Sequence, residues 1–428
     1  MTYGISSSLR ANDNFSLDTS SPGDTTILDT TLSFGLLKET QVDRLEFDLD
    51  GIVRLGEVPG RTETIEFDDP NAAFAYTRDG ANSNFSTDAR INQVDLNFDD
   101  PLRIQDQLNS QSLIIDDGTR TTSRANVRFE TGINDPLGYG FALNYFDERY
   151  TDTTDPGLFD NNTFRSDIFA TFQFSPVTSG RLSYVYTDYD GDEAIQEERE
   201  TNEVVFDLAY ELDAATVLDT FLGYREINET DNTGALQDDQ AGLVYGAVLT
   251  RDMPNGTASI GFDSDIATTG RRTNADISRS LIMPRGTLDA SLGATKGPSG
   301  DIDPIYALDY TYLLPRSAFT ASLSRVFRND SQGNDIRVTR GSLSYLIDIN
   351  AISSVDFTAG YAAVDDAGGN TVTNTDNTTL RATYTRALNA DWNISAGYEY
   401  RNRFEQGVGT AQSNEIFLTL DRIFVVQR

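Results

Sequence analysis

Apolar and polar residues alternate along much of this chain, with the period of two that is typical of half-buried β-strands. In residues 392–400, every second residue is Trp, Ile, Ala or Tyr, and Ile or Leu recurs in the same way in 416–420. Because successive side chains of a strand point to opposite faces, each such strand has one apolar and one polar face. The polar faces contain charge in mid-strand, most densely in 43–54. We therefore expect the apolar faces to contact lipid and the polar faces to line a lumen.

The connections between these segments follow a rhythm of their own. Tight turns rich in Pro, Asn and Gly, such as 134–136 and 253–256, alternate with longer acidic connections. The longer ones span 151–162, 188–201, 229–239, 297–303, 329–335, 365–376 and 405–413. Short and long connections alternate in this way in an up-and-down transmembrane barrel with short periplasmic turns and long outer loops. The prediction is an all-β fold, with residues 1–428 forming one antiparallel barrel.

The strand count follows from the same rhythm. About 17 strands are expected from Thr119 onward and about five before it, which gives an even number of roughly 22. Residues 57–118 are the least regular part, with short strands expected at 72–78 and 88–98. If that region were loop or plug, about 18–20 strands would remain. The last strand should pair with Tyr3–Leu9 and close the barrel.

Composition narrows the possible classes of protein. The hydrophobic fraction is 38%, and no run approaches the ~18 apolar residues of a membrane-spanning helix. The net charge of −34 argues against nucleic acid as a partner, since phosphates would be repelled. The chain has no Cys and no His, which removes disulfides and the commonest catalytic base and metal ligand. We therefore expect a protein that is not an enzyme.

The N-terminal residues bear on export. No apolar signal segment follows Met1, so we expect the numbering to begin at the mature protein with an added Met. Because a strand is expected to begin almost at once, no room is expected for the N-terminal plug domain of a TonB-dependent transporter.

The alternating strands and loop rhythm resemble Gram-negative outer-membrane β-barrels of the porin-like kind. Ile416, Leu418, Leu420 and Phe424 fit the C-terminal signal that the assembly machinery of such proteins reads. Arg422 and Val425–Arg428 depart from it. The opening Leu9–Phe15 is similar to a large, poorly characterised porin-like family that is sometimes linked to exopolysaccharide export.

This resemblance implies residence in the bacterial outer membrane, contact with lipid and lipopolysaccharide, and delivery by the barrel-assembly machinery. It implies a channel for passive diffusion of ions or small polar solutes, with a homo-oligomer left open. The alternatives are an export conduit for exopolysaccharide and a structural or adhesive barrel.

Two sets of candidate site residues follow. Residues 99–118 would be the third outer loop, which folds inward in general porins. Its carboxylates would then face arginines of the lumen wall and form a constriction; the alternative is a solvated outer loop. The residues concerned are Asp99, Asp100, Asp106, Asp116 and Asp117 on the loop, and Arg44, Arg54, Arg124 and Arg128 on the wall.

The second set is acidic. Asp188, Asp190, Asp192 and Glu193 surround Gly191, at a spacing of oxygen ligands that could hold Ca²⁺. The alternative is an ordinary acidic outer loop. No other cofactor is expected.

Overall fold

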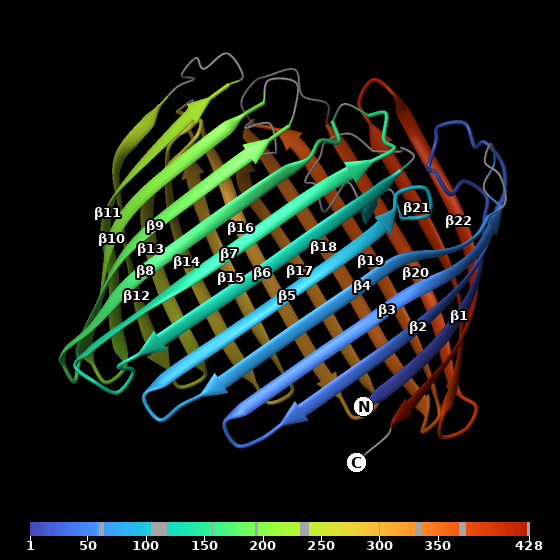
Figure 1. Ribbon diagram of the computed structural model, residues 1–428, viewed down its shortest axis with the longest axis horizontal. Helices are drawn as coiled ribbons and strands as arrows, with labels where there is room; N and C mark the ends of the chain where they lie inside the picture. The colour runs from blue at the N-terminus through green and yellow to red at the C-terminus, as the bar shows by residue number, and fades with distance from the viewer. Residues whose placement is uncertain are drawn as a thin grey trace.

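The computed structural model describes residues 1–57, 59, 64–100, 102–103, 118–155, 157–192, 196–231, 239–298, 300–329, 335–367 and 374–425. These residues form a 22-stranded antiparallel barrel (Figure 1). The predicted count is therefore confirmed, with five strands before Thr119. The strands are β1 (Thr2–Asn12), β2 (Thr25–Glu39), β3 (Asp43–Glu57), β4 (Thr64–Asp79), β5 (Ser83–Asp95), β6 (Thr119–Thr131), β7 (Leu137–Thr151), β8 (Asn161–Ser175), β9 (Thr178–Gly191), β10 (Glu198–Asp213), β11 (Thr216–Thr230), β12 (Gln240–Met253), β13 (Gly256–Ala267), β14 (Gly270–Met283), β15 (Gly286–Lys296), β16 (Ile302–Leu314), β17 (Ser317–Asn329), β18 (Asp335–Asn350), β19 (Ser353–Asp366), β20 (Thr375–Ala387), β21 (Trp392–Glu405) and β22 (Gly409–Val425).

The barrel closes where its first and last strands meet. β1 pairs antiparallel with both β2 and β22, and Tyr3 lies opposite Phe424 while Leu9 lies opposite Leu418. This is the predicted seam. Closure satisfies the backbone N–H and C=O groups of every strand, which a sheet in hydrocarbon requires because no water is present to bond an open edge.

The large apolar side chains lie on the outside. On β12, Leu243, Tyr245 and Leu249 are all exposed, and so are Ile416, Leu418 and Leu420 on β22. An apolar surface on a closed barrel belongs in a bilayer. Among the described residues, no helix is long and apolar enough to span a membrane.

Two arginines of the outward face lie near the short turns. Arg422 donates to Asp391 at 3.2 Å, and its guanidinium lies 4.0 Å from the centre of the Phe424 ring. Arg279 donates to Asn255 at 2.6 Å, beside the turn that joins β12 to β13. Both cations thus reach polar partners at the edge of the apolar band, where their cost is small.

The short turns lie at one end of the barrel together with both termini, and the longer connections lie at the other end (Figure 1). Two outer connections are exceptions. Only two residues separate β13 from β14, and only residues 406–408 separate β21 from β22, where a longer connection was predicted over 405–413.

β4 is longer than the strand predicted at 72–78, and β5 both begins and ends before the strand predicted at 88–98. In β4 the reason is a bulge at which the register shifts between Asp50 and Ile52, so that Gly51 lies opposite both Asp69 and Pro70. Asp69 has a positive φ of 50°. An extra residue interrupts the period of two, because side chains beyond it change face. That interruption made this region look irregular in the sequence.

Candidate functional site

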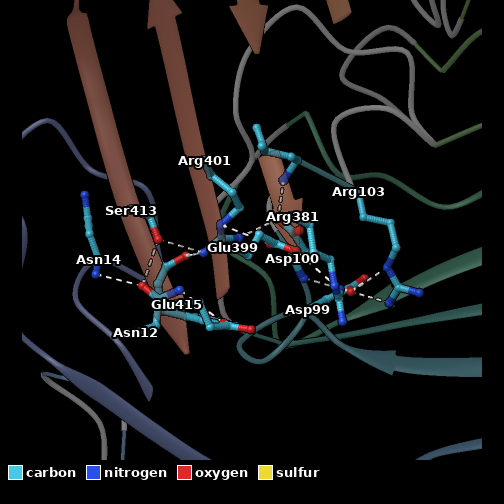
Figure 2. A network of polar contacts seen from close by, with 12 residues as sticks. Asn12, Asn14, Asp99, Asp100, Arg103, Arg381, Glu399, Arg401, Ser413 and Glu415 are labelled. Atoms are coloured by element: carbon cyan, nitrogen blue, oxygen red, sulfur yellow. Dashed lines mark hydrogen bonds and ion pairs between the residues drawn. The ribbon is translucent and has the colours of Figure 1, made fainter. Parts of the chain in front are cut away.

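The chain that leaves β5 turns into the barrel instead of away from it. We call its described part, residues 96–100 and 102–103, the inward segment. The Asp100 carboxylate accepts a hydrogen bond of 2.8 Å from Arg401 on β21 (Figure 2). Around the closed barrel, β22 and β1 to β4 lie between β5 and β21. The inward segment therefore crosses part of the lumen to reach its partner.

Arg54 on β3 anchors the start of this segment. Its side chain is almost fully buried and donates to Asp29 at 2.9 Å and to Asp69 at 2.8 Å. The guanidinium also lies 4.6 Å from the centre of the Phe98 ring. Asp69 in turn accepts from the backbone N–H of Asp95 at 2.7 Å. A cation held by several carboxylates and an aromatic ring offsets the cost of its own burial, so the point of entry is fixed.

Arg401 anchors the far end and holds a second segment as well. Besides Asp100, it donates to Ser413 on β22 at 3.1 Å and to the backbone carbonyl of Phe15 at 3.3 Å. The Ser413 hydroxyl donates to Asn12 at 2.8 Å. The loop between β1 and β2 and the inward segment are thus tied to the wall at one place, beside the seam (Figure 2).

Small apolar clusters inside the barrel reinforce these ties. Phe15, Ile27 and Phe98 form one buried cluster. Leu96 packs with Leu158 and Tyr150 in another. Apolar contacts hold a segment against the wall independently of charge and salt.

A cavity of about 440 Å³ lies beside the tip of the inward segment. The tip contributes Asp100, Leu102 and Arg103, and the wall is provided by β17 to β20. The wall residues are Ser322, Arg328, Val338, Arg340, Gly341, Ser342, Gly360, Tyr361, Ala362, Val364, Asn377 and Thr379.

The wall from β10 to β16 is different, because many carboxylates lie on its polar face besides those that pair with Arg225 and Arg272. We call six of them the acidic strip; they are Asp207, Asp219, Asp263, Asp276, Asp289 and Asp309. Asp219, Asp289 and Asp309 are exposed. Among the described residues, no ion pair within 4.0 Å involves a member of the strip, and Asp263 accepts from Asn274 at 2.8 Å. Carboxylates on a lumen wall that have no ion pair among the described residues attract mobile cations.

The predicted constriction residues of the loop lie in different places in the structure. Asp99 is buried, pairs with Arg103 of the same segment, and its pKa is raised by burial although Arg103 opposes that shift. Asp100 and Arg54 take the roles described above. Asp106, Asp116 and Asp117 lie outside the described residues.

The other predicted wall arginines have partners of their own. Arg124 lies over the Phe146 ring, and Arg128 lies over Phe169 and pairs with Glu130. Arg44 pairs with Glu46 near the short turns. None of the three contacts a described residue of the inward segment in a hydrogen bond or ion pair.

Sequence reasoning missed Arg401, Asp29 and Asp69. The alternation in β21 already places Arg401 on the polar face beside Glu399, so its position was readable. The partner of Arg401 could not be predicted from the sequence, because Asp100 is 301 residues away.

The described part of the proposed Ca²⁺ site shows no ligand cluster. Glu193 lies outside the described residues, and Asp190 accepts from Asn162 at 3.4 Å. Among the residues that the structure describes, no group of three or more carboxylates is arranged to hold a metal ion.

Comparison with known proteins identifies the fold. No family model and no curated sequence matches. Solved structures do match: a mutant of the ferric enterobactin receptor of Pseudomonas aeruginosa has a TM-score of 0.59 at 9% identity, over 99% of this chain and 81% of that one. The ferric-catecholate import receptor Fiu of E. coli scores 0.60 at 12% identity over 98% and 81%, and the FrpB iron transporter of Neisseria meningitidis scores 0.61 at 9% over 99% and 82%. The fold is that of a bacterial outer-membrane β-barrel.

At these identities the likeness extends to architecture alone. Together with the apolar exterior, it places this barrel in the outer membrane.

Proposed function

We propose that this barrel is a passive channel for ions and small polar solutes. The observation that supports this most strongly is the inward segment, which is anchored across part of the lumen through Asp100 and Arg401. A segment fixed in this way narrows the passage without requiring movement, and charged groups around a narrow passage set which solutes cross.

The opposed charges support selectivity. The acidic strip lies on β10 to β16, where Arg225 and Arg272 are engaged by other carboxylates. Further arginines of the polar face occur on β17, β18, β20 and β21. Between walls of opposite sign, a polar solute is oriented as it passes. We further propose that the barrel has no catalytic role, in keeping with a chain that lacks His and Cys.

The surroundings of the barrel form part of the same proposal. We expect lipid and lipopolysaccharide to cover the apolar exterior and the barrel-assembly machinery to insert the chain. A homo-oligomer would appear as a larger species when purified protein is cross-linked in detergent, and a monomer would not.

Conductance of the purified barrel in a planar bilayer tests the proposed function. We expect ohmic steps whose size increases with salt concentration, and swelling of liposomes in small polar solutes. A barrel that inserts, migrates as folded on a gel and conducts nothing would contradict the proposal. Passage of long polysaccharide instead of small solutes would favour an export conduit.

A further inference from the structure

A groove on the outside of the barrel lies where β4 and β5 separate. Among the described residues, the last pair that joins these two strands towards the outer end is Asn71 with Asn92. Beyond that pair, residues 64–68 of β4 pair with β3 alone, and residues 93–95 of β5 pair with β6 alone. The ladder between β4 and β5 therefore stops before either strand ends.

The bulge in β4 accounts for this separation. An extra residue bends its strand and disrupts the ladder, and Pro70 has no N–H group with which to continue it. The Asp69 carboxylate, which Arg54 binds at 2.8 Å, replaces the missing backbone contact by accepting from the N–H group of Asp95 at 2.7 Å. The separation is thus a fixed part of the wall.

The groove has a volume of about 490 Å³, within the range of sites for small ligands. Its floor is low because Gly51 and Ala72 have little or no side chain. Gly51 lies opposite the exposed Leu32, and Ala72 lies opposite the exposed Leu49 and Ile91, so both floor positions face outward. The walls are large apolar side chains, namely Leu32, Phe34, Leu49, Phe67 and Ile91.

Four further residues complete the inner part of the lining, namely Ser33, Asp50, Pro70 and Asn71. Asp50 and Asn71 belong to the polar face by alternation, and the Asn71 amide donates to the Asp50 carboxylate at 2.7 Å. That carboxylate is therefore engaged from the lumen side of the wall.

The end of the groove towards the outer connections is polar. Gln93 and Thr121 lie opposite each other there, and both line the groove. Gln93 is two residues before the end of β5, and Thr121 is two residues after the start of β6. An amide and a hydroxyl offer hydrogen-bond donors and acceptors. The groove thus changes from apolar to polar along its length, as an amphipathic molecule does.

The position of the groove indicates what occupies it. Its walls are continuous with the apolar exterior that the bilayer covers. Water in the groove would leave those walls hydrated within the membrane, whereas a hydrocarbon chain would gain contact with them. A lipid also has a polar end, which would lie nearer the membrane surface, where Gln93 and Thr121 are.

We propose that this groove holds one acyl chain of a membrane lipid, with the polar end of the lipid at Gln93 and Thr121. A chain seated there packs against the bulge and stabilises the point at which the inward segment enters the lumen. The inference goes beyond the channel proposal, since it does not require the barrel to conduct.

Native mass spectrometry of the purified barrel, released from detergent, tests the inference with palmitoyl-lysophosphatidylethanolamine as the probe. We expect one probe molecule to remain bound to each barrel. Glycerophosphoethanolamine, which has the same polar end and no chain, should not be retained, because apolar contact supplies the binding. A barrel that retains neither compound, or both alike, would overturn the inference.

Two variants of matched chemistry separate the groove from the rest of the exterior. Ala72→Phe should fill the floor and weaken probe binding by at least about ten-fold, the contribution of roughly two buried methylene groups. Ala125→Phe is the control: Ala125 is an exposed residue of β6 opposite the exposed Tyr145, outside the groove, and its replacement should leave binding unchanged. Equal losses in the two variants, or full binding by Ala72→Phe, would overturn the inference.

Phe67→Ala provides a test that does not depend on folding of Ala72→Phe. Phe67 is 63% exposed, so its truncation should spare the fold. It removes one wall of the groove and should weaken probe binding by at least about three-fold. Full binding by Phe67→Ala would contradict the inference. A dimer that forms in place of lipid binding, and that Phe67→Ala prevents, would make a second copy of this chain the occupant and would overturn the inference as well.

Stability gives an independent readout. The probe should raise the urea midpoint of the wild-type barrel, since a ligand that binds only the folded state stabilises it, and it should raise the midpoint of Phe67→Ala less. A wild-type midpoint that the probe leaves unchanged would contradict the stabilising role.

Lipid binding and conductance fail separately. Conductance without probe binding would overturn this inference and leave the channel intact. Probe binding without conductance would overturn the passive channel and leave the lipid site.

Discussion

Two parts of the inner wall use charge in opposite ways. From β20 through the seam to β3, buried arginines are paired with carboxylates and with the two segments that enter the barrel. Arg54 and Arg401 there are 3% and 2% exposed. From β10 to β16, the acidic strip faces the lumen without ion pairs among the described residues, and three of its members are exposed.

The paired, buried charges stabilise the structure of the barrel, whereas the unpaired charges of the lumen determine which ions pass. A charge taken out of water must be compensated by partners, so it fixes whatever supplies those partners. A charge left in a wet lumen fixes nothing, but its field reaches passing ions. Substitutions in the first region should therefore change stability and the width of the passage. Substitutions in the acidic strip should change selectivity alone.

The largest effect is expected for Arg54→Met. Asp69, whose side chain is 17% exposed, would lose its cation, although Asp29 would still have Arg10 at 2.7 Å. Breaking a buried pair from one side costs about 3–5 kcal/mol. The measurement is the urea midpoint for loss of heat-modifiable migration on a gel. Arg181→Met, which removes a half-exposed arginine from a paired site, is the control and should cost far less. Equal losses in the two variants would refute the role given to Arg54.

Arg401→Met is expected to have the next largest effect. It frees Asp100 and removes the bonds to Ser413 and to the Phe15 carbonyl, so both entering segments lose their common anchor. We expect a loss of about 2 kcal/mol, below the range for a fully buried pair because Asp100 is 39% exposed. Single-channel conductance should rise as the passage widens. An unchanged conductance in a folded variant would show that the segment does not limit flow.

The acidic strip is tested by Asp289→Asn with Asp309→Asn. Removing two of six carboxylates should lower the permeability of cations relative to anions by about two-fold at low salt, and the effect should fade near 1 M salt as screening increases. Stability should not change. Asp135→Asn, in the turn between β6 and β7, removes a charge away from the strip and should leave the reversal potential unchanged. A shift of equal size in this control would mean that net charge, rather than the strip, determines selectivity.

The barrel could be predicted because its determinants are local. A period of two and alternating short and long connections are visible in any window of about twenty residues. They gave the strand count and the seam. The bulge opposite Gly51 hid the true length of β4, since one extra residue reverses the faces.

The site was only partly predictable, because its contacts are long-range. Asp99 and Asp100 were expected on an inward loop, and residues 96–100 do enter the lumen. The chosen partners Arg44, Arg124 and Arg128 were not the ones used. Every strand has a polar face, so the sequence offers many arginines and does not say which one the loop reaches. Phe98 and Leu96 had been assigned to a strand, whereas they pack inside the barrel as part of the inward segment.

The smallest effect on conductance is expected from the titration of Asp99. The direction of that effect shows whether the neutral or the charged carboxyl favours the inward position. Burial raises the pKa of this carboxyl above its usual value, so its protonated form favours the inward position. The stabilisation is complete below the unfolded value near 3.8 and is lost as the pH rises through the folded pKa. Lowering the pH from about 7 to about 4 should therefore hold the segment more firmly and reduce conductance slightly.

Asp99→Asn should remove that pH dependence and, at neutral pH, alter stability by less than about 0.5 kcal/mol, since the lost pair with the half-exposed Arg103 contributes little. Asp100→Asn is the contrasting variant: it neutralises the carboxylate that Arg401 binds and should loosen the segment at every pH. Conductance of the two variants, recorded over this pH range, separates a carboxyl that tolerates burial only when neutral from one that is needed as an anion. If Asp99→Asn raised conductance as much as Asp100→Asn, Asp99 would be part of the anchor. The Asp99 carboxylate would then belong with the paired charges that fix the inward segment.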